Sequence, residues 1–123
     1  MQLHTLSTSR YMTDEGIKHM QLHTLYTFES SITDEGIKHM QLHTLYATFH
    51  MTDEGIKHMQ LHTLHASRNM TDEGIKHMQL HTLGASFSKI TDEGIKHMQL
   101  RTLYAYDSHQ ITYNIENGIR KNK

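Results

Sequence analysis

The apolar positions of this chain recur with a near-constant spacing, because one block of sequence is repeated along it. The block Thr-Asp-Glu-Gly-Ile-Lys-His-Met-Gln-Leu-His-Thr-Leu is unchanged in four copies, and a fifth copy differs only at Arg101, which replaces a histidine. The five copies occupy residues 13–25, 33–45, 52–64, 71–83 and 91–103. The tail of the block also opens the chain at 1–6, and a divergent copy begins at 112, so successive starts are 20, 19, 19, 20 and 21 residues apart. This periodicity predicts an array of stacked units.

Each unit has room for one strand and one short return element. Two helices would need units of about 34–47 residues, which excludes the α-helical solenoids. Alternation after Leu22 predicts a short strand, in which Leu25 and Thr27 face the core while Tyr26 and Phe28 face the opposite side. Parallel stacking of the units would place neighbouring strands ~4.8 Å apart.

A short helical turn is expected over 13–20 and its equivalents. Thr13 stands where an N-cap belongs, and the Asp-Glu pair after it lies near the positive end of the turn. Gly16 and its equivalents lower helix propensity by ~1 kcal/mol relative to alanine, and we interpret them as points where adjacent coils approach closely. A turn this short is not stable alone, so neighbouring coils must cover Ile17 and Met20.

The spacing of the apolar residues resembles that of a known family. The series Leu80, Leu83, Ala85, Ser88 and Ile90 falls on the pattern L-x-x-L-x-L-x-x-N-x-L, with Ala at the third leucine site and Ser at the asparagine site. The chain thus resembles the leucine-rich repeat family, and its I-T-D-E-G-I-K-H-M segments are similar to the family's I-T-D-x-G-L-x-x-L variant. The resemblance implies an α/β solenoid of about six coils, with a parallel β-sheet on the concave face and short helical turns on the convex face. We expect one domain over 1–123, with coils starting near 1, 22, 42, 61, 80 and 100 and a C-terminal cap at 112–123.

The copies differ mainly at the outward strand positions and in the turn that follows. Tyrosine and phenylalanine on a rigid sheet are good binding anchors, because they offer a large contact area with few torsions to freeze. We therefore predict that a protein or peptide ligand binds here. The predicted contact residues form two columns across the strands: Tyr26, Phe28, Tyr46, Thr48, His65, Ser67, Tyr104 and Tyr106. Drift after recent duplication is the alternative explanation of the same variation.

Thirteen histidines occur, and ten of them belong to two columns copied with the repeat. His19 and His23 have the i,i+4 spacing of a helical metal pair, but the turn should give way to strand between them, and zinc needs three or four ligands. Rings adjacent in one column could also chelate a metal; we favour a solvated ladder and predict no metal site. Because histidine titrates near pH ~6.5 and like charges repel, the columns also suggest that acid loosens the stack.

Composition excludes several classes of function. Twelve basic residues nearly balance 13 acidic ones, and the free cations are scattered or terminal, which disfavours nucleic acid as a partner. Cysteine is absent, and neither a signal peptide nor an apolar run of membrane-spanning length is found, so we expect an intracellular protein with no membrane association. No activated-nucleophile motif or glycine-rich phosphate loop occurs, so we expect neither an enzyme nor a cofactor.

Two functions follow from these expectations. The first is a recognition scaffold that holds a protein or peptide on its open sheet face. The second is a structural protein that assembles end to end, because Met1-Gln2-Leu3 begins inside a repeat without a cap at the N-terminal edge. A designed consensus array is a third origin for such a sequence, and its irregular unit lengths argue against it.

Overall fold

Strands and short helices alternate from residue 5 to residue 104. The computed structural model describes residues 4–27, 30–105, 111 and 119–121. The strands are β1 (Thr5–Ser7), β2 (Thr24–Tyr26), β3 (Thr44–Tyr46), β4 (Thr63–His65), β5 (Thr82–Gly84), β6 (Thr102–Tyr104) and β7 (Ile119–Lys121). The helices are α1 (Asp14–Ile17), α2 (Asp34–Ile37), α3 (Asp53–Ile56), α4 (Asp72–Ile75) and α5 (Asp92–Ile95).

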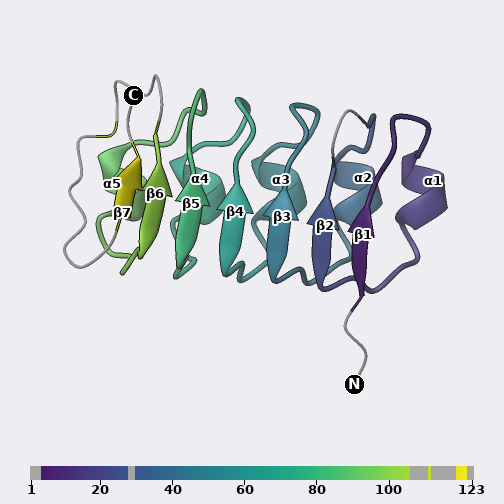
Figure 1. Ribbon diagram of the computed structural model, residues 1–123, viewed down its shortest axis with the longest axis horizontal. Helices are drawn as coiled ribbons and strands as arrows, with labels where there is room; N and C mark the ends of the chain where they lie inside the picture. The colour runs from purple at the N-terminus through teal and green to yellow at the C-terminus, as the bar shows by residue number, and fades with distance from the viewer. Residues whose placement is uncertain (1–3, 28–29, 106–110, 112–118, 122–123) are drawn as a thin grey trace.

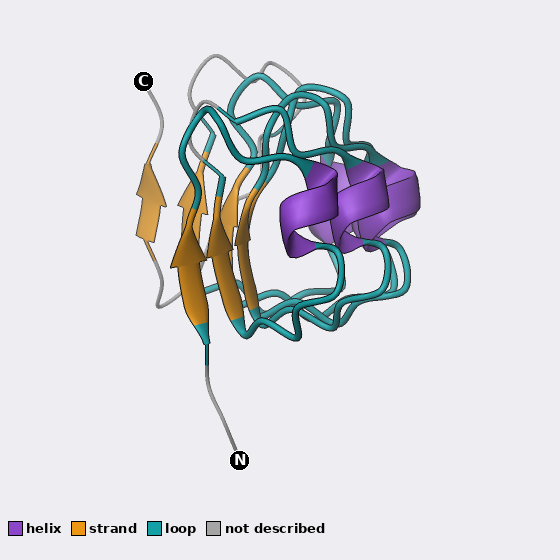
Figure 2. Cartoon of the chain, turned by 90° about the vertical axis from the view of Figure 1, so that its right-hand side faces the viewer, coloured by secondary structure: helices purple, strands orange, loops and turns teal. Residues whose placement is uncertain are grey.

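The strands form one parallel sheet whose order, β1 to β7, is the order of the chain. From β1 to β6 each position of the repeat pairs with the same position of the next copy, as in Thr5 with Thr24 and Leu25 with Leu45. The strands stand in one row and the helices in a second row behind them (Figure 1). Seen from the end, sheet and helices are two layers joined by loops (Figure 2). The predicted α/β repeat solenoid is therefore confirmed.

One strand was not expected. The structure pairs β7 with β6 through Thr102 and Ile119, which places a further parallel strand within the segment interpreted as a C-terminal cap. The sequence there has lost the leucine pattern on which the other strands were predicted.

The core is a set of columns between the two layers. The first leucine of each unit forms a spine of buried side chains: Leu22, Leu42, Leu61, Leu80 and Leu100. The isoleucine at the end of each helix is at most 1 % exposed from Ile17 to Ile95. Burying one such side chain contributes about 1.5–3 kcal/mol, and because each coil covers its neighbour, stability is shared along the array.

A ladder of hydrogen bonds runs along the helical layer and joins each coil to the next. Thr52 donates from its backbone N–H to Oδ1 of Asp34 at 2.8 Å and from Oγ1 to Oδ2 at 2.6 Å. The same pair of bonds recurs between Thr33 and Asp14, Thr71 and Asp53, and Thr91 and Asp72. These threonines also accept from the glutamate N–H two residues later, which confirms four of the predicted N-caps. Thr13 precedes α1 in the same extended conformation but makes no such side-chain bond.

From α2 to α5, the glycine of each helix lies against the aspartate of the preceding coil, so the two coils approach closely there. A Cβ added to Gly55 would lie 2.3 Å from Oδ1 of Asp34, and one added to Gly74 would lie 2.2 Å from Oδ1 of Asp53. These contacts confirm the predicted close approach between coils. None of the helices in the described ranges combines the length and apolarity required to cross a membrane.

Candidate binding face

The open face of the sheet carries a column of rings, built by the last residues of β2, β3, β4 and β6. Register pairs Tyr26 with Tyr46 and Tyr46 with His65, so that these side chains lie over neighbouring strands. The centroids of the Tyr26 and Tyr46 rings are 4.8 Å apart, edge to face. The rings of Tyr46 and His65 stack at 3.9 Å with 20° between their planes. The contacts hold each ring in place, so the column is preorganised.

Gly84 interrupts this column and creates a hollow. Beside it, a space of about 320 Å³ is lined by His65, Ala66, Gly84, Ser86 and Tyr104. The rings of His65 and Tyr104 both line it, and their centroids are 5.9 Å apart. A Cβ at Gly84 would come within 2.6 Å of Nδ1 of His65, so only glycine lets that imidazole lean over β5.

The column is uncharged near neutral pH. Burial lowers the pKa of His65 below its usual 6.5, so the imidazole is neutral at pH 7. Burial, together with the neighbouring Tyr26, raises the pKa of Tyr46. None of the described residues that line the hollow is Lys, Arg, Asp or Glu. The face therefore suits an apolar or aromatic group.

The second predicted column consists of Phe28, Thr48, Ser67 and Tyr106. Its two described members, Thr48 and Ser67, do not face outward as predicted. Thr48 and Ser67 are 7 % and 5 % exposed, and they point into the solenoid. Thr48 donates to the carbonyl of Ile32 at 2.9 Å, and Ser67 donates to the carbonyl of Met51 at 2.7 Å. The reason is that each strand has only three residues, so the alternation of sides stops before these positions. Their hydroxyls then satisfy buried carbonyls of the preceding coil.

The structure thus brings together four of the eight predicted contact residues. They form the column of rings: Tyr26, Tyr46, His65 and Tyr104. Phe28 and Tyr106 lie outside the described residues. Gly84 and its hollow were missed, although a glycine among ring-bearing residues in the same repeat position was a signal that could have found them.

A histidine stack runs beside the aromatic column, just before the strands. The rings of His23, His43, His62 and His81 lie 4.5, 4.5 and 4.6 Å apart, within 15° of parallel. In each, Nδ1 is 2.8–3.0 Å from Oγ1 of the threonine that follows. Parallel rings engaged in this way do not converge on a common point.

The other histidine column has different partners. His58, His77 and His97 donate from Nε2 to the carbonyls of Met40, Met59 and Met78 in the preceding coil, at 2.8–3.2 Å. Within the described residues, no group of three or more histidine, aspartate or glutamate side chains is arranged to hold a metal ion. The two columns therefore serve as contacts between and within coils.

The histidine stack should make the protein less stable in acid. Burial and the neighbouring rings lower the pKa of His43 and of His62 below 6.5. Because the unfolded chain then binds these protons at a higher pH than the folded one, the free energy of unfolding falls as the pH drops below about 6.5. We expect a lower Tm at pH 5 than at pH 8 by thermal denaturation. A double variant, His43→Gln with His62→Gln, should narrow that difference; equal Tm values at the two pH values for the unmodified chain would contradict the prediction.

Comparison with known proteins does not assign the chain to a family. The chain matches no protein-family model, and no curated protein is significantly similar to it.

Proposed function

We propose that this protein is a recognition scaffold that binds a segment of a partner protein across its open sheet face. The observation that carries the proposal is the column of rings interrupted at Gly84. Rings that are already fixed by contact with their neighbours lose little conformational freedom when a ligand binds. Aromatic residues around a small hollow are typical of binding hot spots, which contribute most of the binding free energy of an interface.

The chemistry of the face defines the ligand. A hollow of about 320 Å³ has room for a single large side chain, and the described residues that line it carry no acidic or basic group of the Asp, Glu, Lys or Arg type. The five strands from β2 to β6 extend over about 19 Å at ~4.8 Å per step, which matches a short peptide segment. We therefore propose a peptide that places one apolar or aromatic side chain in the hollow lined by His65 and Tyr104 and lies along Tyr46 and Tyr26.

We also propose that the chain is a short-unit leucine-rich repeat protein. The support is the pairing of a three-residue strand with a short helix in the units from β1 to β5, and the burial of the residues at the leucine positions, such as Leu80 and Leu83. Solenoids of this kind commonly use an extended sheet face for binding, which agrees with the proposed ligand.

Peptide selection tests the proposal. A displayed library of random peptides would be panned on the intact chain, with peptides that also bind a Gly84→Tyr variant removed at each round. Gly84→Tyr places a ring in the hollow, and the atoms that it displaces belong to the His65 side chain and not to the backbone or the core, so the fold should be kept. We expect selected peptides to share an apolar or aromatic residue and to bind Tyr104→Ala at least about tenfold more weakly, as judged by Kd.

A matched control uses the same substitution elsewhere. Tyr11 is 79 % exposed and lies outside the column, so Tyr11→Ala should leave the Kd unchanged. Peptides that bind Gly84→Tyr and Tyr104→Ala as tightly as the unmodified chain would overturn the proposed site.

A further inference from the structure

The histidine stack presents a row of ring nitrogens that no contact within the described residues uses. In each of its four imidazoles, Nδ1 lies 2.8–3.0 Å from the hydroxyl of the following threonine, whereas Nε2 has no hydrogen-bond partner in that part of the chain. His43 and His62, in the middle of the row, are exposed. The rings repeat every 4.5–4.6 Å within 15° of parallel, so their Nε2 atoms are evenly spaced along one edge of the solenoid.

Arg101 extends the row by one position. It stands where the other copies of the repeat have histidine. Its backbone N donates to the carbonyl of His81 at 2.8 Å, as the backbone N of His81 does to the carbonyl of His62. Arg101 is exposed and forms no ion pair with a described residue. Because a guanidinium is always charged and donates from a planar fork that fits phosphate oxygens, the row ends in a permanent positive charge.

No described acidic side chain neutralises the row. Every described aspartate and glutamate belongs to a helix, where the glutamates pair with lysines and four of the aspartates accept hydrogen bonds from threonines. Burial lowers the pKa of His43, and the charges that add to this effect are those of His62 and His23. On its other side, His23 donates from its backbone N to the carbonyl of His4 at 2.9 Å. The described titratable groups of the row are therefore all histidines, apart from Arg101.

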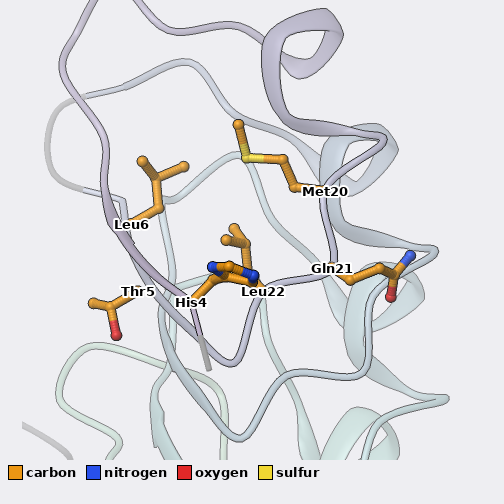
Figure 3. Close-up of a pocket in the computed structure, with 6 residues that line it drawn as sticks. All are labelled: His4, Thr5, Leu6, Met20, Gln21 and Leu22. Carbon is orange, nitrogen blue, oxygen red and sulfur yellow. The ribbon is translucent and has the colours of Figure 1, made fainter. Parts of the chain in front are cut away.

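The segments that lead from the helices to the stack are also without acidic residues. Gln21 precedes His23 by two positions and projects away from the apolar side chains of Met20 and Leu22 (Figure 3). The other glutamines at this position are exposed as well: Gln41, Gln60, Gln79 and Gln99. The same segments carry the second histidine column, which gains positive charge in acid together with the stack. Protonation therefore makes this edge of the solenoid cationic.

We propose that this edge binds sulfate or phosphate groups when its histidines are protonated, each group accepting hydrogen bonds from the Nε2–H of two neighbouring rings of the stack. A protonated imidazole donates from both nitrogens, so Nδ1 keeps its threonine while Nε2 binds the ligand. Such charge-assisted bonds are about twice as strong as neutral ones. A bound anion also offsets the repulsion between neighbouring protonated rings.

The parallel rings suit an anion of several atoms better than a metal ion. A metal ion requires ligands that converge on one point, which parallel rings do not provide. The oxygens of a tetrahedral group point in different directions, so two of them can meet donors on rings whose centroids are 4.5 Å apart. This binding is independent of the proposed peptide site, because the stack lies just before the strands and the aromatic column lies at their ends.

Sulfate is the probe, because its charge does not change between pH 5 and pH 8. The unmodified chain would be titrated with sodium sulfate, with sodium chloride of equal ionic strength as reference, and the ring Cε1–H signals would be followed by NMR. At pH 5 we expect the signals of His43 and His62 to shift and saturate, with a Kd at least about tenfold lower than at pH 8. The signal of His77 should shift far less, because its Nε2 already donates to the carbonyl of Met59.

Two matched double variants locate the site. His43→Gln with His62→Gln should raise the Kd for sulfate at pH 5 at least about tenfold. His58→Gln with His77→Gln removes the same number of protonated rings from the second column and should leave that Kd within about twofold. Thermal denaturation at pH 8 shows whether both variants are folded; if the first is not, the signals of the unmodified chain decide.

Dextran sulfate, compared with free sulfate at equal sulfate concentration, identifies the source of the group. Tighter binding of the polymer supports a chain that fills several positions of the row at once, and equal binding supports the free ion. The proposal would be overturned by a Kd that is the same at both pH values or by the lack of a saturable shift at His43 and His62. Equal weakening by the two double variants would overturn it as well, because net charge alone would then explain the binding.

Discussion

Gly55→Ala is expected to lower the free energy of unfolding by about 1–3 kcal/mol, the usual cost of forcing an extra methyl group into a packed contact. The new Cβ would lie 2.3 Å from Oδ1 and 2.8 Å from Cγ of Asp34. Asp34 cannot easily move away, because both of its oxygens accept hydrogen bonds from Thr52. The coils must therefore separate or the ladder must break. Urea denaturation followed by circular dichroism would measure the change.

The first coil supplies a control in which the same substitution should not lower the free energy of unfolding. Gly16 occupies the same position in the repeat, but nothing described lies within 4 Å of its added Cβ. Alanine favours a helix over glycine by up to about 1 kcal/mol, so Gly16→Ala should leave stability unchanged or raise it. Equal losses at both glycines would show that backbone conformation, and not contact with Asp34, determines the cost.

A double variant tests the contact directly. Asp34→Ala removes the atoms that meet the new methyl group, so Gly55→Ala should cost little in that background. The two changes would then be strongly non-additive, as expected for side chains in direct contact. Additive losses would place the effect of Gly55→Ala elsewhere.

The stacking of the coils could be predicted from sequence because every copy of the repeat carries leucines at the same positions. Leucines at one position in every copy can all be buried only if the copies stack in register, and a slip of one residue would turn each strand inside out. The burial of Leu25, Leu45 and Leu64, and the pairing of each with its counterpart, follow from that constraint.

The candidate site could be predicted only in part, because side chains alternate only as long as the strand lasts. Tyr46 lies on the last residue of β3 and faces outward as expected, but Thr48 lies in the turn, where its hydroxyl meets the carbonyl of Ile32. A sequence that repeats every 19 or 20 residues does not show where a three-residue strand ends. The role of Gly84 depends on the tilt of the neighbouring His65 ring, which is a property of packing.

The helical layer shows a similar limit. The Thr-Asp pair predicted a capped turn from local chemistry, and the cap is present at Thr71. The larger function of the pair is between coils: Asp53 accepts from both donors of Thr71, a residue 18 positions later. Helix-capping rules describe one coil at a time, so they could not show that the carboxylate of one coil accepts hydrogen bonds from the next coil.

Asp53→Ala should therefore be among the most destabilising single changes on the surface of this protein. Its Oδ1 is 2.9 Å from the backbone N of Thr71, and its Oδ2 is 2.5 Å from Oγ1 of the same residue. A hydrogen bond to a charged group contributes about 1.5–3 kcal/mol, and both donors would be left partly buried, so we expect a loss of about 3 kcal/mol. Asp53→Asn keeps one acceptor oxygen and should lose less.

The neighbouring Glu54 distinguishes this ladder from ordinary surface charge. Glu54 forms an exposed ion pair with Lys57 at 2.9 Å, and its side chain is 73 % exposed. Such pairs contribute about 0–1 kcal/mol, so Glu54→Ala should be nearly neutral although it removes the same charge one residue away. Chemical denaturation of both variants at several salt concentrations would separate the two cases, because salt screens an exposed pair far more than a partly buried one. Similar losses for Asp53→Ala and Glu54→Ala would mean that the carboxylates act through net charge alone, and that contact between apolar columns is sufficient to hold the coils together.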